Sequence, residues 1–448
     1  MGKVSSMQKN RNFSYFIITL PCGRMEETMN KPLKRLTGKE YVLGVQHLFA
    51  MFGATVTVPI MTGMNPSIAL LTAGLGTLIF HLITKGIVPV FLGSSFAFMS
   101  ALIAIIGGNT ANIPKAQGGI IVAGLIYVVF AILVYFLGIE RIKKLFPPIV
   151  TGPVIIVIGL TLSPSAITNA SSCWLLAIIV LVAIITVMCF TKGFIKMMPI
   201  ILGLLIGYGA ALLLDATGAT ASWGLAESGK LIDFTAVEKA SWFFDFSAYT
   251  LPQFDLSSIL MIAPIALVTF MEHIGDITTN GAVVGKDFYS DPGLHRTLLG
   301  DGIATAFAGL LGGPPNTTYG ENTGVLAVTK NYDPRIIRLA ALFAIILGLI
   351  GKFGAVLQTI PTAIIGAVSF VLYGMISSIG LRSLVESKPD FSQNRNLLIV
   401  AVILVTGLGM PAIQITDTVS ISGLFVATLV GVLLNVILPK EKKEEEKN

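Results

Sequence analysis

Apolar stretches with few charges follow one another along almost the whole chain, and they limit its possible folds more than any other feature. Each stretch is roughly 20 residues long, the length at which a helix crosses ~30 Å of hydrocarbon. Only 12% of the residues are charged, against about 25% in soluble domains, so the chain cannot cover a water-exposed surface. We therefore predict an all-α membrane protein with fourteen transmembrane segments. They are Gly44–Met61, Ser67–Thr84, Ile87–Ile106, Gly118–Gly138, Ile149–Ala166, Cys173–Phe190, Met197–Leu214, Leu256–Gly275, Thr297–Gly312, Asn316–Thr329, Ile336–Ala355, Thr362–Leu381, Leu397–Met410 and Val419–Leu438.

The positions of Lys and Arg predict how the chain is oriented. With a cytoplasmic N-terminus, only four of the 30 Lys and Arg residues fall in outer loops: Lys115, Lys230, Lys239 and Lys352. Positive charge gathers in cytoplasmic loops, so we expect a multi-pass protein of the cell membrane (inner or plasma) with both termini in the cytoplasm. The net charge of +6 then faces anionic lipid, and no nucleic-acid partner is expected.

Two segments, the third of each half, are interrupted in a similar way. The run Ile87–Phe96 is a β-like apolar stretch with a Gly-Ser-Ser break, and Gly312–Asn322 is an extended stretch rich in Gly and Pro; each leads into a helical pattern. Paired interrupted segments indicate the binding site of an inverted-repeat transporter, and each new helix start points free N–H groups at that site. Kinked packing helices are the alternative interpretation.

The acidic residues Glu272 and Glu321 lie inside predicted segments, where a carboxylate is costly unless it is paired, hydrated or neutral. Burial favours the neutral form, which suits a group that gains and loses a proton. Asp276 lies four residues after Glu272, on the same helical face, and two nearby carboxylates tend to share protons. Alternatively, Asp276 has already left the membrane and is solvated, and the two glutamates are structural.

His47 lies within the first segment, either as a group that orients a carboxylate or as a packing residue. His273 adjoins Glu272 but projects about 100° away around the helix. The run Glu272–Asp276 lacks the His pair of helix-borne zinc sites, and we expect no metal, no cofactor and no enzyme activity.

The implied cavity combines two carboxylates, backbone N–H groups at two helix starts, and the aromatic rings of Phe96 and Tyr319. Carboxylates accept hydrogen bonds from N–H groups, backbone N–H groups donate to carbonyls, and aromatic faces stack on flat rings. A small planar imide satisfies all three, although amino acids and cations would also use carboxylates.

Six stretches together resemble the nucleobase–cation symporter 2 (nucleobase–ascorbate transporter) family, in its bacterial uracil permease branch. The similarity covers the chain from about Lys39 to Leu438, and Thr317–Asn322 is its most specific run. The matching stretches are Gly44–Thr55, Leu92–Phe98, Glu272–Gly275, Asp291–Arg296, Pro315–Gly324 and Ile360–Gly374.

The resemblance implies a seven-plus-seven inverted repeat, with short β-like stretches in segments three and ten. A core domain (44–138 and 256–355) would hold the substrate, and a gate domain (149–214 and 362–438) would also form a homodimer. The remaining parts are a cytoplasmic arm (1–43), an outer loop (215–255) and a cytoplasmic tail (439–448). An alternative translation start at Met25 would make residues 1–24 dispensable.

The resemblance also implies roles for individual residues. Glu272 and Glu321 would bind the pyrimidine edge, and the backbone N–H groups of Phe96 and Gly320 would meet its carbonyls. Tyr319 would pack near the ring. Further implied contacts are Ala54, lining the site, Tyr373, touching it from the gate, and His47, bracing it.

The resemblance favours import of uracil, or a closely related nucleobase, with protons by alternating access. Xanthine-type members commonly have Gln where this chain has Glu321, and uracil permeases of this group can have His where it has Asp276, so a relay here would run through carboxylates alone. The alternatives are a xanthine or uric acid permease, or an anion transporter with the same fold. A membrane enzyme would need a nucleophile–base pair or a metal site at one membrane face, and the sequence offers neither. The paired broken segments argue against a channel or receptor.

Overall fold

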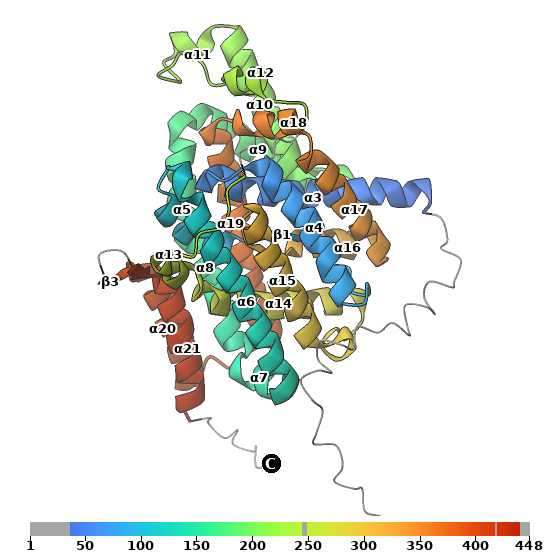
Figure 1. Ribbon diagram of the computed structural model, residues 1–448, viewed down its shortest axis with the longest axis vertical. Coiled ribbons are helices and arrows are strands. Elements are labelled where there is room, and N and C mark those ends of the chain that lie inside the picture. Colours follow the sequence, from blue (N-terminus) through green and yellow to red (C-terminus); the bar gives the residue numbers. More distant parts are fainter. Residues whose placement is uncertain (1–35, 244–248, 417–418, 440–448) are drawn as a thin grey trace, which may run out of the picture. The chain divides into compact units, whose positions relative to one another are not determined.

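The computed structural model describes residues 36–243, 249–416 and 419–439, and it is mostly helical (Figure 1). Between the two halves, the described part of the predicted outer loop holds two short helices, α11 (Ala219–Ser222) and α12 (Thr235–Lys239). The elements of the first half are α3 (Gly38–Thr62), α4 (Pro66–Ile83), β1 (Leu92–Ser94), α5 (Met99–Ile106), α6 (Ile113–Leu137), α7 (Ile139–Leu145), α8 (Pro148–Ala170), α9 (Trp174–Phe190) and α10 (Pro199–Ala216). Those of the second half are α13 (Leu256–Ile262), α14 (Ile265–Val284), α15 (Leu294–Leu311), β2 (Asn316–Thr318), α16 (Gly320–Thr329), α17 (Pro334–Gly348), α18 (Gly351–Gln358), α19 (Thr362–Ser387), α20 (Asn394–Gly409), β3 (Ile413–Thr416), β4 (Val419–Ile421) and α21 (Gly423–Ile437).

The chain divides into two compact units, Met1–Val42 and Leu43–Asn448. In the described part of the first unit, the backbone N–H and the hydroxyl of Thr37 donate hydrogen bonds to the Glu40 carboxylate, at 2.6 and 3.0 Å. This contact pairs an N–H group that the start of α3 would otherwise leave free. The hypothesis of a second start at Met25 concerns residues outside the described part.

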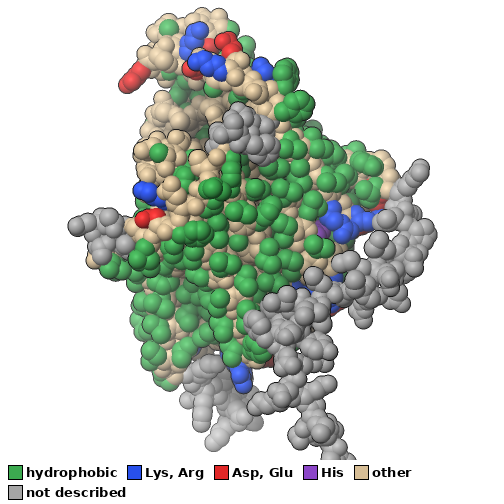
Figure 2. All heavy atoms as spheres, viewed as in Figure 1, with side chains coloured by type: hydrophobic (Ala, Val, Ile, Leu, Met, Phe, Trp, Pro, Cys, Tyr) green, Lys and Arg blue, Asp and Glu red, His purple; other side chains and the backbone are tan. Residues whose placement is uncertain are grey.

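The surface of the second unit is that of a membrane protein. Among the described residues, seven helices are long and apolar enough to cross a membrane, and three shorter apolar helices accompany them. Large apolar side chains such as Val129, Ile178 and Leu213 are exposed, and Figure 2 shows hydrophobic side chains spread across the face, with the charged groups near its margins. Lipid can solvate such a surface and water cannot. The predicted fold class, an all-α membrane protein with β stretches in segments three and ten, is confirmed.

Three interruptions were not predicted from the sequence. Segment eight is divided into α13 and α14 next to Pro264, which has no N–H to continue the helix. Segment eleven is divided into α17 and α18 at Ile350, whose extended backbone forms a bridge with Phe243. Two short strands, β3 and β4, pair antiparallel before α21, where the sequence analysis expected the fourteenth segment to begin.

The packing of the helices has the symmetry of an inverted repeat. Exchanging each segment of the first half with its counterpart in the second turns the α6–α15 pair into the α17–α4 pair, and both pairs are in contact. In the same way α9–α10 becomes α20–α21, and α8–α20 becomes α19–α9, all of which are observed. The pairs α8–α19 and β1–β2 each map onto themselves.

The helices also pack in two groups. The crossing group, which contains the β1–β2 pair, comprises α4, α5, α6 and α13 to α18. The flanking group comprises α8, α9, α10 and α19 to α21, and α8 packs along α19 at its centre. Contacts between the groups run chiefly through α14, which touches α8 and α21, and through α13, which touches β4. The acidic residues described below belong to the crossing group: Glu272 and Asp276 lie on α14, and Glu321 lies on α16.

Glycines allow α6 and α15 to touch through their backbones. A Cβ atom added to Gly124 would lie 2.6 Å from the carbonyl oxygen of Gly302, and one added to Gly302 would lie 2.7 Å from that of Gly124. Close helix approach through small residues is a principal source of packing energy in lipid.

Replacing Gly124 with Ala is therefore expected to lower the free energy of unfolding by about 1–3 kcal/mol, because the added methyl group overpacks the contact. Thermal unfolding of the detergent-solubilised protein measures the effect. Gly209→Ala in α10 is the matched control, since a Cβ there meets nothing within 4 Å. Equal unfolding temperatures for the two variants would contradict the role of this contact.

Candidate functional site

The site is organised by two short strands that come from opposite halves of the chain. β1 and β2 pair antiparallel, with Leu92 opposite Thr318, Gly93 opposite Thr317 and Ser94 opposite Asn316. Two more hydrogen bonds extend the pairing, from Ser95 N to Pro315 O at 2.8 Å and from Tyr319 N to Phe91 O at 3.0 Å. Beyond the strands, the segment that contains β1 continues through a 3₁₀ turn into α5, and the segment that contains β2 continues into α16. The free N–H groups of both helix starts therefore lie near one place, the strand crossing.

Tyr319 locks this crossing in place. Its hydroxyl donates to the carbonyl of Ser94 at 2.9 Å and accepts from the hydroxyl of Thr55 at 3.3 Å. The ring lies where a Cβ on Gly93 would be, so only glycine leaves room for it. Tyr319 therefore holds the two halves together as well as forming part of the cavity wall.

A small cavity of about 30 Å³ lies beside the crossing. It brings together six of the predicted residues: Phe96, Glu272, Asp276, Tyr319, Gly320 and Glu321. The remaining lining residues are Ile155, Thr317, Thr318, Ile376 and Ile379. Three carboxylates from α14 and α16 thus share a space with an aromatic ring and the first residues of α16.

The two acids of α14 are held differently. Asp276 accepts a hydrogen bond from the Thr318 hydroxyl at 2.6 Å, so α14 and β2 are tied together at the cavity. The buried Oε2 atom of Glu272 has no hydrogen-bond partner among the described residues. An unpaired buried oxygen is costly, and a ligand N–H group would relieve that cost. The structure places Asp276 at the cavity, not in a solvated loop.

The other predicted residues, Tyr373, His47 and Ala54, do not line the cavity. The Phe96 ring packs edge-on against the Tyr373 ring, with centroids 5.7 Å apart. His47 contacts no carboxylate among its described hydrogen bonds; the Asn322 side chain lies 3.1 Å from its Nδ1 and donates to its carbonyl at 3.0 Å. Ala54 is fully buried in α3. His47 therefore contacts the residue that follows Glu321, not Glu321 itself.

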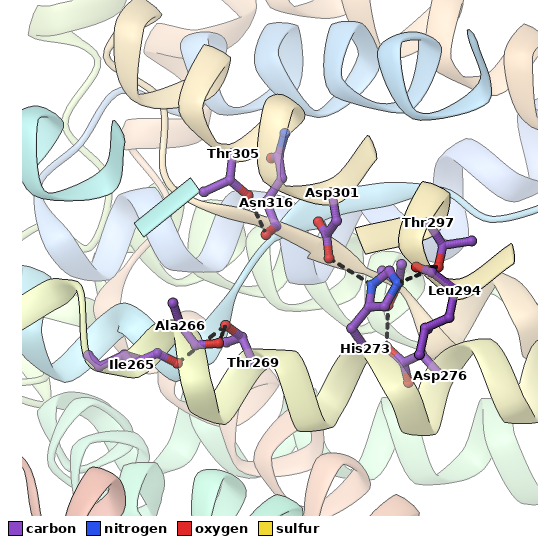
Figure 3. Close-up of polar contacts among 11 residues, drawn as sticks. Ile265, Ala266, Thr269, His273, Asp276, Leu294, Thr297, Asp301, Thr305 and Asn316 are labelled. Carbon is purple, nitrogen blue, oxygen red and sulfur yellow. Dashed lines mark hydrogen bonds and ion pairs between the residues drawn. The ribbon is translucent and has the colours of Figure 1, made fainter. Parts of the chain in front are cut away.

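Sequence reasoning missed a buried polar pair behind the cavity. His273 and Asp301 are both fully buried, and His273 Nδ1 lies 2.9 Å from Asp301 Oδ2 (Figure 3). His273 Nε2 lies 3.0 Å from the hydroxyl of Thr297, which itself donates to the Leu294 carbonyl at 3.0 Å. With the hydroxyl proton used in that way, Nε2 is the donor to Thr297. The available signal was the acid at 301 inside the predicted segment Thr297–Gly312.

Two larger cavities adjoin the site. The wide vestibule, of about 590 Å³, lies between the crossing and flanking groups and is lined by residues such as Thr151, Thr279 and Arg382. The narrow vestibule, of about 360 Å³, is lined by residues such as Ser100 and Ser422. The wide vestibule shares Asp276 and Gly320 with the small cavity, and the narrow vestibule shares Phe96 with it, so both adjoin the cavity.

Two helices broken at a strand crossing, surrounded by lipid-exposed helices, define a membrane permease with discontinuous helices. The chain belongs to the permease family, whose model matches residues 38–416, and the family resemblance expected from the sequence is confirmed. It is 43% identical to the uracil permease of Bacillus caldolyticus over 93% of this chain and 97% of that one. It is 42% identical to the uracil permease of Bacillus subtilis (strain 168), over 90% and 93%. It is 41% identical to the putative pyrimidine permease RutG of Escherichia coli (strain K12), over 89% of each.

Solved structures of transporters share the fold. The transmembrane domain of the cyanobacterial bicarbonate transporter BicA superposes with a TM-score of 0.56 at 14% identity, covering 89% of this chain and 97% of that one. The murine anion transporter Slc26a9 in its inward-facing state superposes with a TM-score of 0.63 at 11% identity, covering 96% and 72%. At these identities the likeness concerns the architecture alone.

Removing the Asp301 carboxylate should destabilise the protein, because His273 then keeps a buried N–H or N without its partner. Asp301→Ala is expected to lower the free energy of unfolding by about 1–3 kcal/mol, read as a lower thermal midpoint in detergent. The exposed Glu238 in α12 provides the control, and Glu238→Ala should leave the midpoint nearly unchanged. Similar midpoints for both variants would show that the pair contributes little to stability.

Proposed function

We propose that the protein imports uracil, or a closely related nucleobase, by proton symport with alternating access. The observation that carries this proposal is the cavity in which Glu272, Asp276 and Glu321 meet the Phe96 ring beside two helix starts. The relatives named uracil permeases, which match over most of their length, support the choice of substrate.

The chemistry of an imide ring matches this cavity. Its N–H groups would donate to Glu272, whose Oε2 lacks a partner among the described residues, and to Glu321. Its carbonyls would accept from the backbone N–H groups of Phe96 and Gly320, at helix starts where such groups are free. Its flat face would pack on Phe96. Tyr319, held by Ser94 and Thr55, would keep both helix starts in register with the ring.

Transport requires the cavity to open. Ligand sites usually measure 300–1,000 Å³, whereas about 30 Å³ holds little more than one or two waters. The crossing group together with α3 would act as the core domain (44–138 and 256–355), and the flanking group as the gate domain (149–214 and 362–438). Movement of one against the other would expose the site to the two vestibules in turn.

Proton coupling would use the acids of α14. Glu272 and Asp276 lie on one helical face at one cavity, and neighbouring carboxylates titrate together. A proton on either would remove the mutual repulsion and favour the loaded, mobile state, so proton and substrate affinities would depend on each other. His47, bound to Asn322, would brace the turn that carries Glu321.

In the cell, the proposed partners are uracil, protons and the lipid bilayer, and a second copy bound through the gate domain. The protein would lie in the cell membrane with both termini in the cytoplasm, as the distribution of Lys and Arg predicts. As a permease it would move its substrate without chemical change.

A second candidate is an anion transporter, because two solved structures with this fold are named as transporters of bicarbonate or other anions. Glu321 argues against it, since an anion at the start of α16 would meet a carboxylate in the first helical turn. A xanthine or uric acid permease would use the same imide chemistry, and it would differ in the size of the ring system of its substrate.

Uptake of radiolabelled uracil into proteoliposomes tests the proposal. An inward proton gradient should drive accumulation of uracil. Glu272→Gln should lower uracil uptake about 10- to 100-fold, which is the factor expected for the loss of a hydrogen bond to a charged group. Glu238→Gln changes an exposed acid in α12 and is the control that should leave uptake intact. Failure of uracil to accumulate or to compete would overturn the substrate.

Glu321→Gln separates the candidates. For a uracil permease we expect a loss of uptake about as large as for Glu272→Gln, since one of two carboxylates on the pyrimidine edge is replaced. Competition by xanthine, uric acid and bicarbonate is measured alongside. Full uracil uptake in this variant would leave the acid a structural role, and stimulation of bicarbonate transport would favour the anion transporter.

A further inference from the structure

Asp276 is the acid at which the small cavity meets the wide vestibule, since it lines both. Glu272 and Glu321 line the small cavity, and in the described part of the chain neither of them lines the wide vestibule. A space of about 590 Å³ has room for many waters. A proton from the wide vestibule therefore reaches Asp276 before it reaches either glutamate.

The bond between Thr318 and Asp276 has the geometry of a bond to an ionised acid. The Thr318 hydroxyl donates to Oδ2 of Asp276 at 2.6 Å, and bonds from hydroxyl groups to carboxylates measure ~2.5–2.7 Å. Thr318 is only 2% exposed, so water competes little for its hydroxyl. A hydrogen bond to an ionised group is roughly twice as strong as one between neutral groups. Protonation of Asp276 therefore weakens this bond.

The same bond joins the two walls of the small cavity. Asp276 lies on α14, one turn after Glu272, whereas Thr318 is the last residue of β2 and precedes Glu321 by three residues. Its two ends therefore help to set the separation of the two glutamates that are proposed to hold the ring. While the bond is intact, the cavity between these walls measures only about 30 Å³.

A second side-chain bond joins α14 to α16, and it cannot respond to a proton. The Asn280 amide donates to the Thr323 hydroxyl at 3.1 Å and to the Pro89 carbonyl at 3.2 Å. Amide and hydroxyl groups keep their protons across the physiological range, so this bond is constant. Of the two bonds, the one from Thr318 is the bond whose strength depends on protonation.

Charged and titratable side chains lie around Asp276 on several elements. They are Glu272 on α14, Tyr289 in the loop that follows it, Asp301 on α15, Glu321 on α16, and Arg382 and Glu386 on α19. Two of these groups already have partners of opposite type: Arg382 Nε lies 2.7 Å from Glu386 Oε1, and Asp301 is paired with His273. Among the described residues Asp276 forms no ion pair, and the Thr318 hydroxyl is the group that holds its carboxylate.

We propose that Thr318 is a positioning residue that makes the substrate cavity depend on the protonation of Asp276. A proton taken up from the wide vestibule weakens the bond between α14 and β2, which lets the two walls separate and admit the ring. Without the Thr318 hydroxyl, the walls separate whether or not the proton is present, and substrate and proton affinities become independent. This inference rests on the proposed function, because it assumes that uracil and protons move together.

Two transport measurements on Thr318→Val in proteoliposomes test the inference. The first is the steady-state accumulation of radiolabelled uracil under an inward gradient of about one pH unit, with the membrane potential clamped at zero. For one proton per uracil the parent can reach about a tenfold ratio, because a tenfold ratio of either species has the same free energy. The variant should fall toward a ratio of about one. The second measurement is uracil counterflow without a pH gradient, which should persist in the variant.

Two further variants separate coupling from stability. Thr318→Ser keeps the hydroxyl and should restore accumulation. Thr305 also holds β2, since its hydroxyl donates to the Asn316 carbonyl at 3.0 Å and involves no acid (Figure 3). Thr305→Val should slow accumulation and counterflow alike and leave the final ratio unchanged, because that ratio depends on coupling and not on the amount of active protein.

Parent-like accumulation in Thr318→Val, an equal fall in Thr305→Val, or no rescue by Thr318→Ser would each overturn the role of Thr318. Loss of counterflow together with accumulation would also overturn it, because Thr318 would then be needed for folding or binding. Thr318→Ala removes the same hydroxyl and replaces the valine variant if that one does not fold. A parent that neither exchanges nor accumulates uracil would instead overturn the proposed function, and this inference with it.

Discussion

The pairing of β1 with β2 is the interaction on which the rest of the structure depends. Backbone N–H and C=O groups inside a membrane must find partners within the protein, and irregular backbone is tolerated only where protein or a cavity surrounds it. Here each broken segment supplies the partner of the other, through three residue pairs and two flanking hydrogen bonds. Once this need is met, two helices begin at the same place, and their unpaired N–H groups create a polar site among apolar helices.

The site joins two surfaces of unlike chemistry. The crossing group contributes the carboxylates of Glu272, Asp276 and Glu321 and the helix starts. The flanking group contributes aliphatic and aromatic side chains, among them Ile379 and Tyr373. A polar face can hold a ligand through hydrogen bonds, while an apolar face makes no hydrogen bonds to it that must break. This difference suits the proposed movement of one group against the other.

Much of the fold followed from the sequence because lipid leaves few choices. Apolar length marked the segments, and the breaks at Gly93 and Gly320 marked the crossing, since both signals are local. The pair formed by His273 and Asp301 was missed because its partners lie on α14 and α15, and no local pattern joins them. Likewise the pairing of Asn322 with His47 depends on a contact between distant segments. The division of segment eleven depends on Phe243 in the loop.

The strand crossing also has a consequence for how the protein is made. Tyr319 is 225 residues beyond Ser94, to which it is bonded. At a synthesis rate of ~5–20 residues per second, the ribosome needs roughly 10–50 s to deliver the second strand after the first. During that time the first interrupted segment has entered the membrane without its partner. Insertion of this protein therefore passes through a half-built intermediate with an open strand edge, which the insertion machinery must shelter until the second repeat arrives.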